Sequence, residues 1–410
     1  MNADAKALAA SFDLEKLTPE FYDNPYPTYR ALRENEPVKR LPNGTVFLTR
    51  YDDLVATYKN TKSFSSDKKR EFAPKYGDTP LYEHHTTSLV FNDPPSHTRV
   101  RRLIMGALSP RAIAGMEGDL VKLVDGLLDA IAAKGACELI EDFAASIPIE
   151  VIGNLLDVPH DERGPLRDWS LAILGALEPV VSSEAAARGN RAVTNFLAYL
   201  ETLVARRRAK PGNPERDVLT RLIQGEGSGG ENGERLTEKE LLHNCIFLLN
   251  AGHETTTNLI GNGLVALDRH PDQKQRLIDN PELIKTAVEE MLRYESSNQL
   301  GNRMTTERVE LGGVMLDAGT SVTLCIGAAN RDPAQFPDPE RFDIARTPNR
   351  HLAFATGAHQ CAGMALARLE GAIAISRFLA RFPNYSVSGQ PVRGGRVRFR
   401  GFLSVPCAIG

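Results

Sequence analysis

The chain contains 410 residues, which exceeds the usual length of a domain built around one simple core. Hydrophobic residues make up 42% of it and charged residues 25%, as in an ordinary folded globular protein. Because the formal net charge is only −3, the composition gives no bias toward nucleic acid or an anionic membrane, and we expect neither among the partners.

The cysteines and the N-terminus predict a reducing compartment. The cysteines are scattered, include no C-x-x-C pair and are odd in number. The N-terminal segment lacks the basic and apolar regions of a signal peptide, and no stretch approaches the ~18 apolar residues of a membrane span. We therefore expect a soluble cytoplasmic protein. The cysteines are Cys137, Cys245, Cys325, Cys361 and Cys407.

In the first half of the chain, short strands precede a long helical region. Pro42-Asn43-Gly44 supplies a turn between two extended runs, which predicts a hairpin over Val38–Thr49. From Ser96 to about Ala209, apolar residues recur at spacings of three and four, the period of amphipathic helices. The polar, glycine-rich run Gly225–Glu234 then predicts a loop.

A long helix is predicted next. Thr237 and Glu240 match a capping box, and the first stop signal is His270-Pro271. About 33 residues at ~1.5 Å each give roughly 50 Å, enough to cross a whole domain. Short strand-like runs follow at 309–326 and within the last 25 residues or so, so helices dominate the predicted fold.

The middle of this long helix carries the polar run Asn250-Ala-Gly-His-Glu-Thr-Thr-Thr-Asn258. Ala251 and Thr255 share one helix face, and a threonine hydroxyl can bond back to the preceding turn, so the two would leave a shallow recess. Glu254 points elsewhere and could carry protons between that recess and solvent. Two other interpretations stay open: a polar face packed on another helix, or a zinc site, whose H-E-x-x-H pattern lacks its second histidine at Thr257.

A single cysteine stands in the run HLAFATGAHQCAG, residues 351–363. Gly357 and Gly363 bracket Cys361, and a long helical run follows. The free N–H groups of that helix predict a lowered thiol pKa, and the glycines let the backbone pass close to a flat ligand. This arrangement suits a thiolate bond to haem iron, although a lone cysteine is more often a buried structural thiol.

Four motifs, in this order along the chain, resemble those of the cytochrome P450 family. AGHETT, residues 251–256, resembles the long-helix motif (A/G)-G-x-(D/E)-T-(T/S), and EMLR, residues 290–293, resembles E-x-x-R. PERF, residues 339–342, resembles the meander segment. FATGAHQCAG, residues 354–363, matches the haem-ligand loop F-x-x-G-x-(H/R)-x-C-x-G at every fixed position. The likeness covers nearly the full chain.

The resemblance implies a mainly α fold, the large helical fold of haem-thiolate monooxygenases, with a minor antiparallel β portion. It implies a single catalytic domain over residues 1–410, with the β portion at about 38–50, 306–326 and 384–407. It also implies that Glu290, Arg293 and the meander arginine, Arg341, form a buried charge cluster with a structural role.

The resemblance further implies haem b as the cofactor, with Cys361 as the ligand of its iron. Thr255 and Glu254 would be the catalytic residues: the hydroxyl would hold bound oxygen and a water, and the carboxyl would relay protons. Four basic residues would contact the two propionates, namely His97, Arg101, Arg303 and His351. The full set of expected haem contacts is His97, Arg101, Ala251, Arg303, His351, Phe354, Gly357, Cys361 and Gly363.

The implied reaction is the activation of O2 and the hydroxylation or O-dealkylation of a small, mainly apolar organic substrate. The chain shows no flavin or iron–sulfur signature, so electrons from NAD(P)H would arrive through a ferredoxin reductase and a ferredoxin. Arg102, Arg111 and Arg368 are the candidates for a basic docking face. The alternative is a haem protein that is not a monooxygenase, either peroxide-driven or a sensor or carrier, which the Glu254-Thr255 pair disfavours.

By family position, five stretches should line the substrate pocket. We expect a largely apolar lining, with His84-His85 among the polar exceptions or, as an alternative, exposed on a loop. The five stretches are Tyr82–Leu89, Leu171–Val181, Leu248–Ala251, Ser296–Leu300 and Phe402–Leu403.

Overall fold

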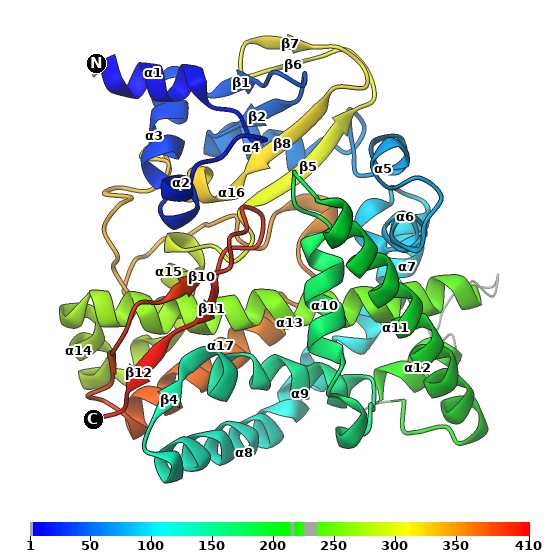
Figure 1. Cartoon of the computed structure of the whole chain (residues 1–410), viewed down its shortest axis with the longest axis vertical. Helices are drawn as coiled ribbons and strands as arrows, with labels where there is room; N and C mark the ends of the chain where they lie inside the picture. Colours follow the sequence, from blue (N-terminus) through cyan, green and yellow to red (C-terminus); the bar gives the residue numbers. More distant parts are fainter. Residues whose placement is uncertain (1–2, 215–216, 225–235) are drawn as a thin grey trace.

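The computed structural model describes residues 3–214, 217–224 and 236–410 (Figure 1). The polar loop predicted at 225–234 lies outside these residues. Helices make up most of the described chain, and strands are short, as the sequence predicted. Among the described residues, no helix combines the length and the apolar character needed to cross a bilayer.

The α-helices are α1 (Ala3–Ser11), α2 (Pro19–Asp23), α3 (Tyr26–Asn35), α4 (Tyr51–Lys59), α5 (Lys69–Tyr76), α6 (Pro80–Thr87), α7 (Ser96–Ala107), α8 (Pro110–Lys134), α9 (Ser146–Leu155), α10 (Leu166–Gly175), α11 (Ser183–Ala209), α12 (Val218–Gln224), α13 (Glu238–Arg269), α14 (Pro271–Asp279), α15 (Ile284–Tyr294), α16 (Ile326–Ala329) and α17 (Met364–Arg381). Short 3-10 turns are η1 (Leu89–Phe91), η3 (His160–Glu162), η4 (Pro281–Leu283) and η5 (Gly357–His359), and η2 (Leu139–Ala144) is a π-helix.

The strands are β1 (Val38–Arg40), β2 (Val46–Leu48), β3 (Phe64–Ser65), β4 (Cys137–Glu138), β5 (Leu300–Thr305), β6 (Val309–Leu311), β7 (Val314–Leu316), β8 (Ser321–Cys325), β9 (Ser386–Val387), β10 (Val392–Arg393), β11 (Phe402–Ser404) and β12 (Pro406–Ala408).

A five-stranded sheet, in the order β1-β2-β8-β5-β3, forms the upper part of the molecule in Figure 1. The predicted hairpin is present, since β1 pairs antiparallel with β2 and Val38 lies opposite Leu48. Strands β2 and β8 pair in parallel, whereas the sequence analysis expected an antiparallel β portion. Side chains alternate along β2 with the period of two expected for a strand: Phe47 packs in one hydrophobic cluster, while Val46 and Leu48 pack in another.

The region 96–209 is mostly helical, as predicted, but strand β4 and the π-helix η2 interrupt it. Cys137 of β4 lies directly opposite Cys407 of β12, so a strand close to the C-terminus completes this small sheet. Pairing with a segment about 270 residues away overrides the local helical pattern, and a window of a few turns contains no sign of it.

Helix α13 runs through the middle of the molecule (Figure 1) and packs against α9, α10, α11, α15 and α17. Its start is the predicted capping box: the Glu240 N–H donates to the Thr237 hydroxyl, and the Glu240 carboxylate accepts from the Thr237 N–H. The polar run in its middle does not break it, because the helix is continuous over 32 residues. A Cβ at Gly252 would collide with the side chain of Ile152, so this glycine permits the close approach of α9.

A charge cluster lies behind the Cys361 loop, and its membership corrects one expectation. The Arg293 guanidinium, 0% exposed, donates to both Glu290 carboxylate oxygens at 2.7 and 2.8 Å. The third member is Arg346, whose Nε lies 3.2 Å from both oxygens. Arg341 contributes its main-chain carbonyl, which accepts from Arg293 and Arg346, while its side chain is exposed. The arginine that pairs here comes five residues later than the meander motif implied.

Replacing Glu290 by Gln should strongly destabilise the fold, because two buried guanidinium groups would lose their counter-ion. We expect the free energy of unfolding to fall by ~3–5 kcal/mol, measured by urea denaturation of the holoenzyme. As a control, Asp119→Asn removes the exposed pair with Lys122 and should cost less than ~1 kcal/mol. Equal effects of the two changes would contradict a supporting role for the cluster.

Candidate active site

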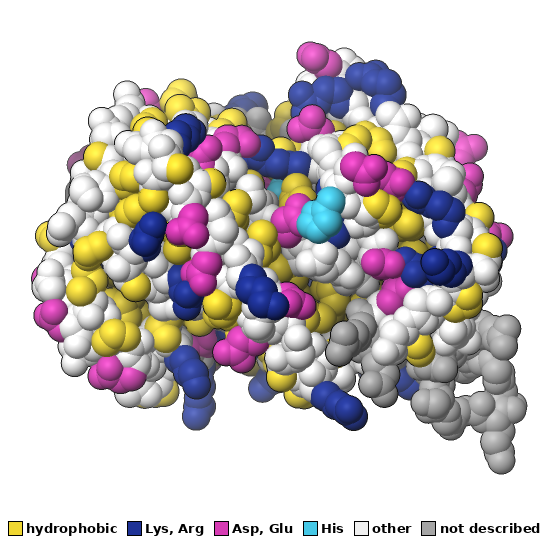
Figure 2. Space-filling model, turned by 90° about the horizontal axis from the view of Figure 1, so that it is seen from below, with side chains coloured by type: hydrophobic (Ala, Val, Ile, Leu, Met, Phe, Trp, Pro, Cys, Tyr) yellow, Lys and Arg dark blue, Asp and Glu magenta, His cyan; other side chains and the backbone are white. Residues whose placement is uncertain are grey.

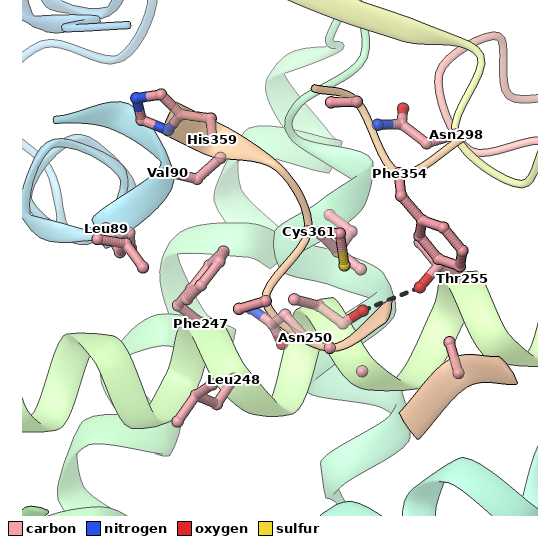
Figure 3. A pocket seen from close by; sticks show the side chains of 18 of the residues that line it. Leu89, Val90, Phe247, Leu248, Asn250, Thr255, Asn298, Phe354, His359 and Cys361 are labelled. Carbon is pink, nitrogen blue, oxygen red and sulfur yellow. Dashed lines mark hydrogen bonds between the residues drawn. The ribbon is translucent and has the colours of Figure 1, made fainter. Parts of the chain in front are cut away.

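A cavity opens between the middle of α13 and the segment 353–367 that contains Cys361 (Figure 3). Its volume is about 360 Å³, room for on the order of ten waters. Of the predicted site residues, eight line it together: His97, Arg101, Ala251, Thr255, Arg303, Phe354, Cys361 and Gly363. Glu254, His351 and Gly357 do not line it.

Cys361 is held at the cavity wall by a tight loop. Its N–H donates to the Phe354 carbonyl at 2.9 Å, which closes the loop just before α17 begins. It is the only one of the five cysteines with an exposed side chain, and what exposes it is the cavity, since protein surrounds it. In Figure 3 its sulfur points across the cavity toward α13. The other four thiols are buried, so one thiol alone can meet a ligand here.

The protein groups around Cys361 do not lower its pKa, contrary to the sequence expectation. Burial raises the pKa of the thiol, although the Gly363 N–H and the charges of Arg101 and Arg368 act in the opposite direction. A helix start is therefore insufficient to hold a thiolate at this position. A metal cation bound to the sulfur would supply the missing stabilisation, because a coordinating thiol is deprotonated outright.

The two glycines of the loop have different roles. Gly357 has a φ of +75°, and a Cβ there would lie 2.6 Å from the main-chain oxygen of Tyr58, so this glycine lets the loop pack on the end of α4. A Cβ at Gly363 would meet nothing within 4 Å, and this residue lines the cavity. Only Gly363 therefore fits the expectation of backbone left open to a flat ligand.

One edge of the cavity gathers basic side chains without acidic partners. The rings of His97 and His359 lie 3.9 Å apart, Arg303 is 7% exposed, and Arg101 donates to the Gln360 carbonyl. Among the described residues, Arg303 donates only to a main-chain carbonyl, and neither nitrogen of His97 has a partner. Burial, and then the charges of Arg303, His97 and Arg101, lower the pKa of His359 to about 2.

His359 replaces His351 in this cluster, which corrects a predicted site residue. The His351 Nε2 lies 3.2 Å from the Glu289 carboxylate, and Arg368 donates to the same carboxylate at 2.7 and 2.8 Å. His351 therefore serves an ion-pair network outside the cavity. The sequence did contain the signal for His359, because it occupies the fixed H/R position two residues before the cysteine.

These residues fit haem b. A buried arginine and two unpartnered imidazoles are costly unless an anion binds among them, and two carboxylates on one edge of a ligand satisfy that requirement. The free thiol lines the same cavity and would be the residue that holds the iron. The open space at Gly363 and the apolar side chain of Phe354 suit the face of a flat macrocycle.

On the opposite wall, α13 presents the predicted recess. The Thr255 hydroxyl donates to the Ala251 carbonyl at 2.9 Å, and both residues line the cavity. The hydroxyl oxygen thus keeps its lone pairs for a ligand or a water. In Figure 3 Thr255 stands on the helix face that looks toward Cys361.

Glu254 lies behind this wall and is 6% exposed, so it has no direct access to solvent. One carboxylate oxygen accepts from Arg396 at 2.5 Å, and the other has no partner. Burial raises the pKa of Glu254 to about 7, in spite of the opposing charge of Arg396. It faces a second, smaller cavity that His253 and Asn258 also line. The direct link between Glu254 and solvent that the sequence predicted is therefore absent in the described part of the chain.

The distal walls are mainly aliphatic, and four of the five predicted stretches contribute to them. Phe402 and Leu403 line the smaller cavity instead, and Arg398 and Phe399 take their place. His84 and His85 are 2% exposed, which rules out the exposed-loop alternative. The sequence missed a group of aliphatic side chains from α7, α9 and α12: Ile104, Leu108, Ile152, Leu155 and Val218.

Comparison with known proteins agrees with this geometry. The family model for cytochrome P450 matches residues 171–393, more than half of the chain. The chain is 37% identical over 372 residues to the biotin biosynthesis cytochrome P450 of Bacillus subtilis, covering 90% of this chain and 92% of that protein. It is also 37% identical over 397 residues to the vitamin D(3) 25-hydroxylase of Pseudonocardia autotrophica, covering 95% of each.

Among solved structures, P450BioI in complex with an acyl carrier protein ligated to hexadec-9Z-enoic acid superposes with a TM-score of 0.89. The two chains are 35% identical in sequence, and the match covers 96% of this chain and all of P450BioI. The chain belongs to the cytochrome P450 family. It is an oxidoreductase, a monooxygenase that uses haem b, O2 and electrons delivered from NAD(P)H by partner proteins to oxidise an organic substrate.

Replacement of His359 and of His351 by Asn separates their roles. His359→Asn should increase the rate of haem transfer to apomyoglobin by about tenfold, because a propionate loses a donor. His351→Asn should leave that rate unchanged and lower the free energy of unfolding by ~1–3 kcal/mol, because Glu289 loses a partner. Equal rates of haem loss in the two variants would contradict the assignment.

Proposed function

We propose that Cys361 is the axial ligand of the haem iron and that four basic side chains hold the two propionates. Haem bound in this way supplies the chemistry by which one atom of O2 enters a C–H bond, and thiolate donation assists O–O cleavage. The observation that carries the proposal is the single free thiol on a cavity whose edge gathers unpaired basic groups. The four basic residues are His97, Arg101, Arg303 and His359.

Thr255 and Glu254 deliver the protons that oxygen reduction requires. The Thr255 hydroxyl, anchored on the Ala251 carbonyl, accepts a hydrogen bond from a water and orients it in the cavity. Glu254 is about half protonated at neutral pH, because burial raises its pKa to about 7. Its carboxyl lies on the other side of α13, so rotation of its side chain away from Arg396 brings the proton to the water beside Thr255.

The electron donor is a ferredoxin served by a ferredoxin reductase. Helix α7 lies against the cysteine loop through the contact of Arg101 with Gln360. Arg111, at the start of α8, is exposed and adds a positive charge on this side, and Arg102 is exposed on α7. Arg368 contributes less, because Glu289 neutralises it. Elsewhere charges of both signs are interspersed, as the face in Figure 2 shows.

The substrate is a small, mainly apolar organic molecule. Leucine, isoleucine, valine and phenylalanine side chains supply most of the cavity wall, so burial of apolar surface contributes most of the binding free energy. Asn250 is among the polar exceptions; it is 2% exposed, and its side-chain oxygen has no protein partner. The resident molecule therefore combines an apolar body with hydrogen-bonding groups at fixed places.

Cys361→Ser tests the proposal. The reduced, carbon-monoxide-treated wild-type protein should show the long-wavelength Soret band of a thiolate-ligated haem, and the variant should lose it. Cys407→Ser changes a buried thiol away from the cavity and should leave the band in place. A spectrum that Cys361→Ser leaves unchanged would overturn the assignment of the iron ligand.

Thr255→Ala should keep haem and substrate binding and reduce product per NAD(P)H about 10²-fold, with the electrons recovered as peroxide. In the wild type, coupling should fall as pH rises through about 7, because Glu254 then loses its proton. Glu254→Gln should remove that pH dependence as well as lower coupling. Assays of peroxide and product between pH 6 and 8.5 measure the coupling and its pH dependence. Intact coupling in Thr255→Ala would rule out the relay.

A further inference from the structure

Arg398 lines the active-site cavity and is tied to its walls by neutral groups alone. It lies between strands β10 and β11, near the C-terminus. Its Nε donates to the Leu177 carbonyl at 2.9 Å, its Nη1 donates to the Leu300 carbonyl at 2.9 Å, and its Nη2 donates to the Asn302 side-chain oxygen. These contacts fix the guanidinium between the end of α10 and strand β5.

The acidic residues near Arg398 are engaged elsewhere. Glu178 accepts from the main-chain N–H groups of Val397 and Arg398 at 3.0 and 3.2 Å, and not from the guanidinium. Glu71 pairs with the Nζ of Lys68 at 2.6 Å. In the described part of the chain, no carboxylate lies within ion-pair distance of the Arg398 guanidinium. A cation in this position is costly to enclose without an anion.

Two further basic side chains lie near Arg398. Lys75 has no carboxylate partner either, because its Nζ donates to the main-chain oxygen of Glu178 at 2.7 Å. His85 lines the cavity and is 2% exposed, and one of its ring nitrogens is buried without a partner. Burial, and then the charges of Lys75 and Arg398, lower the pKa of His85 to about 3. A bound anion would relieve each of these conditions.

The remaining donors of Arg398 match a carboxylate. A guanidinium has five N–H groups, and the three hydrogen bonds use one on each nitrogen. One N–H on Nη1 and one on Nη2 stay available, and each can donate to a carboxylate oxygen. Because three wall contacts already hold the side chain, little rotamer entropy remains to be lost on binding.

We infer that Arg398 binds the carboxylate of the substrate, and that the substrate class is organic acids with an apolar body. The body lies along the aliphatic wall, past Leu174 and Leu248, toward the thiol of Cys361. Oxidation then takes place on the apolar part, at a distance from the carboxylate set by the length of the molecule. This inference deepens the proposed function and rests on it, since the carboxylate is needed only if the cavity holds a substrate.

Calorimetric titration of the holoenzyme tests the inference without measuring turnover. The probes are dodecanoate, hexadecanoate and 4-butylbenzoate, each compared with its methyl ester. At least one acid should bind about tenfold or more tightly than its ester, because only the acid can pair with the guanidinium. If each ester binds as tightly as its acid, or if no acid binds, the inference is overturned. This comparison uses the wild-type chain alone, so it does not depend on the folding of a variant.

Variants then test whether Arg398 causes the preference for the acid over its ester. Arg398→Gln should weaken the preferred acid about tenfold or more and leave its ester unchanged. Arg398→Lys should retain part of the preference, since it keeps the charge but loses the guanidinium donors. Arg308→Gln is the matched control, because that arginine is exposed and its carboxylate partner, Asp317, lies 3.8 Å away. A preference for the acid that survives Arg398→Gln would also overturn the inference.

The test separates failure of this inference from failure of the proposed function. If the Soret band of the carbon-monoxide complex shows thiolate ligation while acids and esters bind equally, the monooxygenase assignment stands and the carboxylate site falls. A third outcome is that the protein binds hexadecanoyl acyl carrier protein tightly, has no affinity for free hexadecanoate and is unaffected by Arg398→Gln. The substrate would then be an acyl group on a carrier protein, and the role of Arg398 would likewise be overturned.

Discussion

The site depends on one continuous helix. Helix α13 forms one wall of the cavity, and the other elements of the site are held in place by packing against this helix. Its continuity comes from a capping box at Thr237 and from close approaches such as that of Ile152 at Gly252. Because the helix does not break at its polar run, Thr255 faces the cavity and Glu254 faces away from it. The Glu254 carboxyl and the Thr255 hydroxyl thus lie on different faces of the helix.

Much of this arrangement could be predicted from the sequence, and the reasons differ among the elements. The limits of α13 were predictable because they rest on local signals, a capping box and a His-Pro stop. The position of Cys361 was predictable because its loop matches a motif at every fixed position. The strand at Cys137 was not, because it exists only through pairing with Cys407, and no local window contains that information.

The errors in the site share a physical origin. His351 and His359 are both histidines next to the cysteine loop, and only the fold decides which one meets Glu289 and which one meets the cavity. Arg341 and Arg346 differ in the same way, since both follow the E-x-x-R helix and only one reaches Glu290. Sequence patterns identify which types of charge a region supplies, whereas partner choice depends on packing across long separations.

Gly357 has a consequence for the order in which the protein assembles. The loop that carries Cys361 packs at this glycine against the main chain of Tyr58, about 300 residues earlier. The basic edge likewise joins His97 near the N-terminus to Arg303 and His359. A C-terminal fragment that contains the thiol therefore lacks the surface that shapes its loop. Contacts of such high sequence separation cost much loop-closure entropy, so the shape of the Cys361 loop depends on residues far apart in the chain.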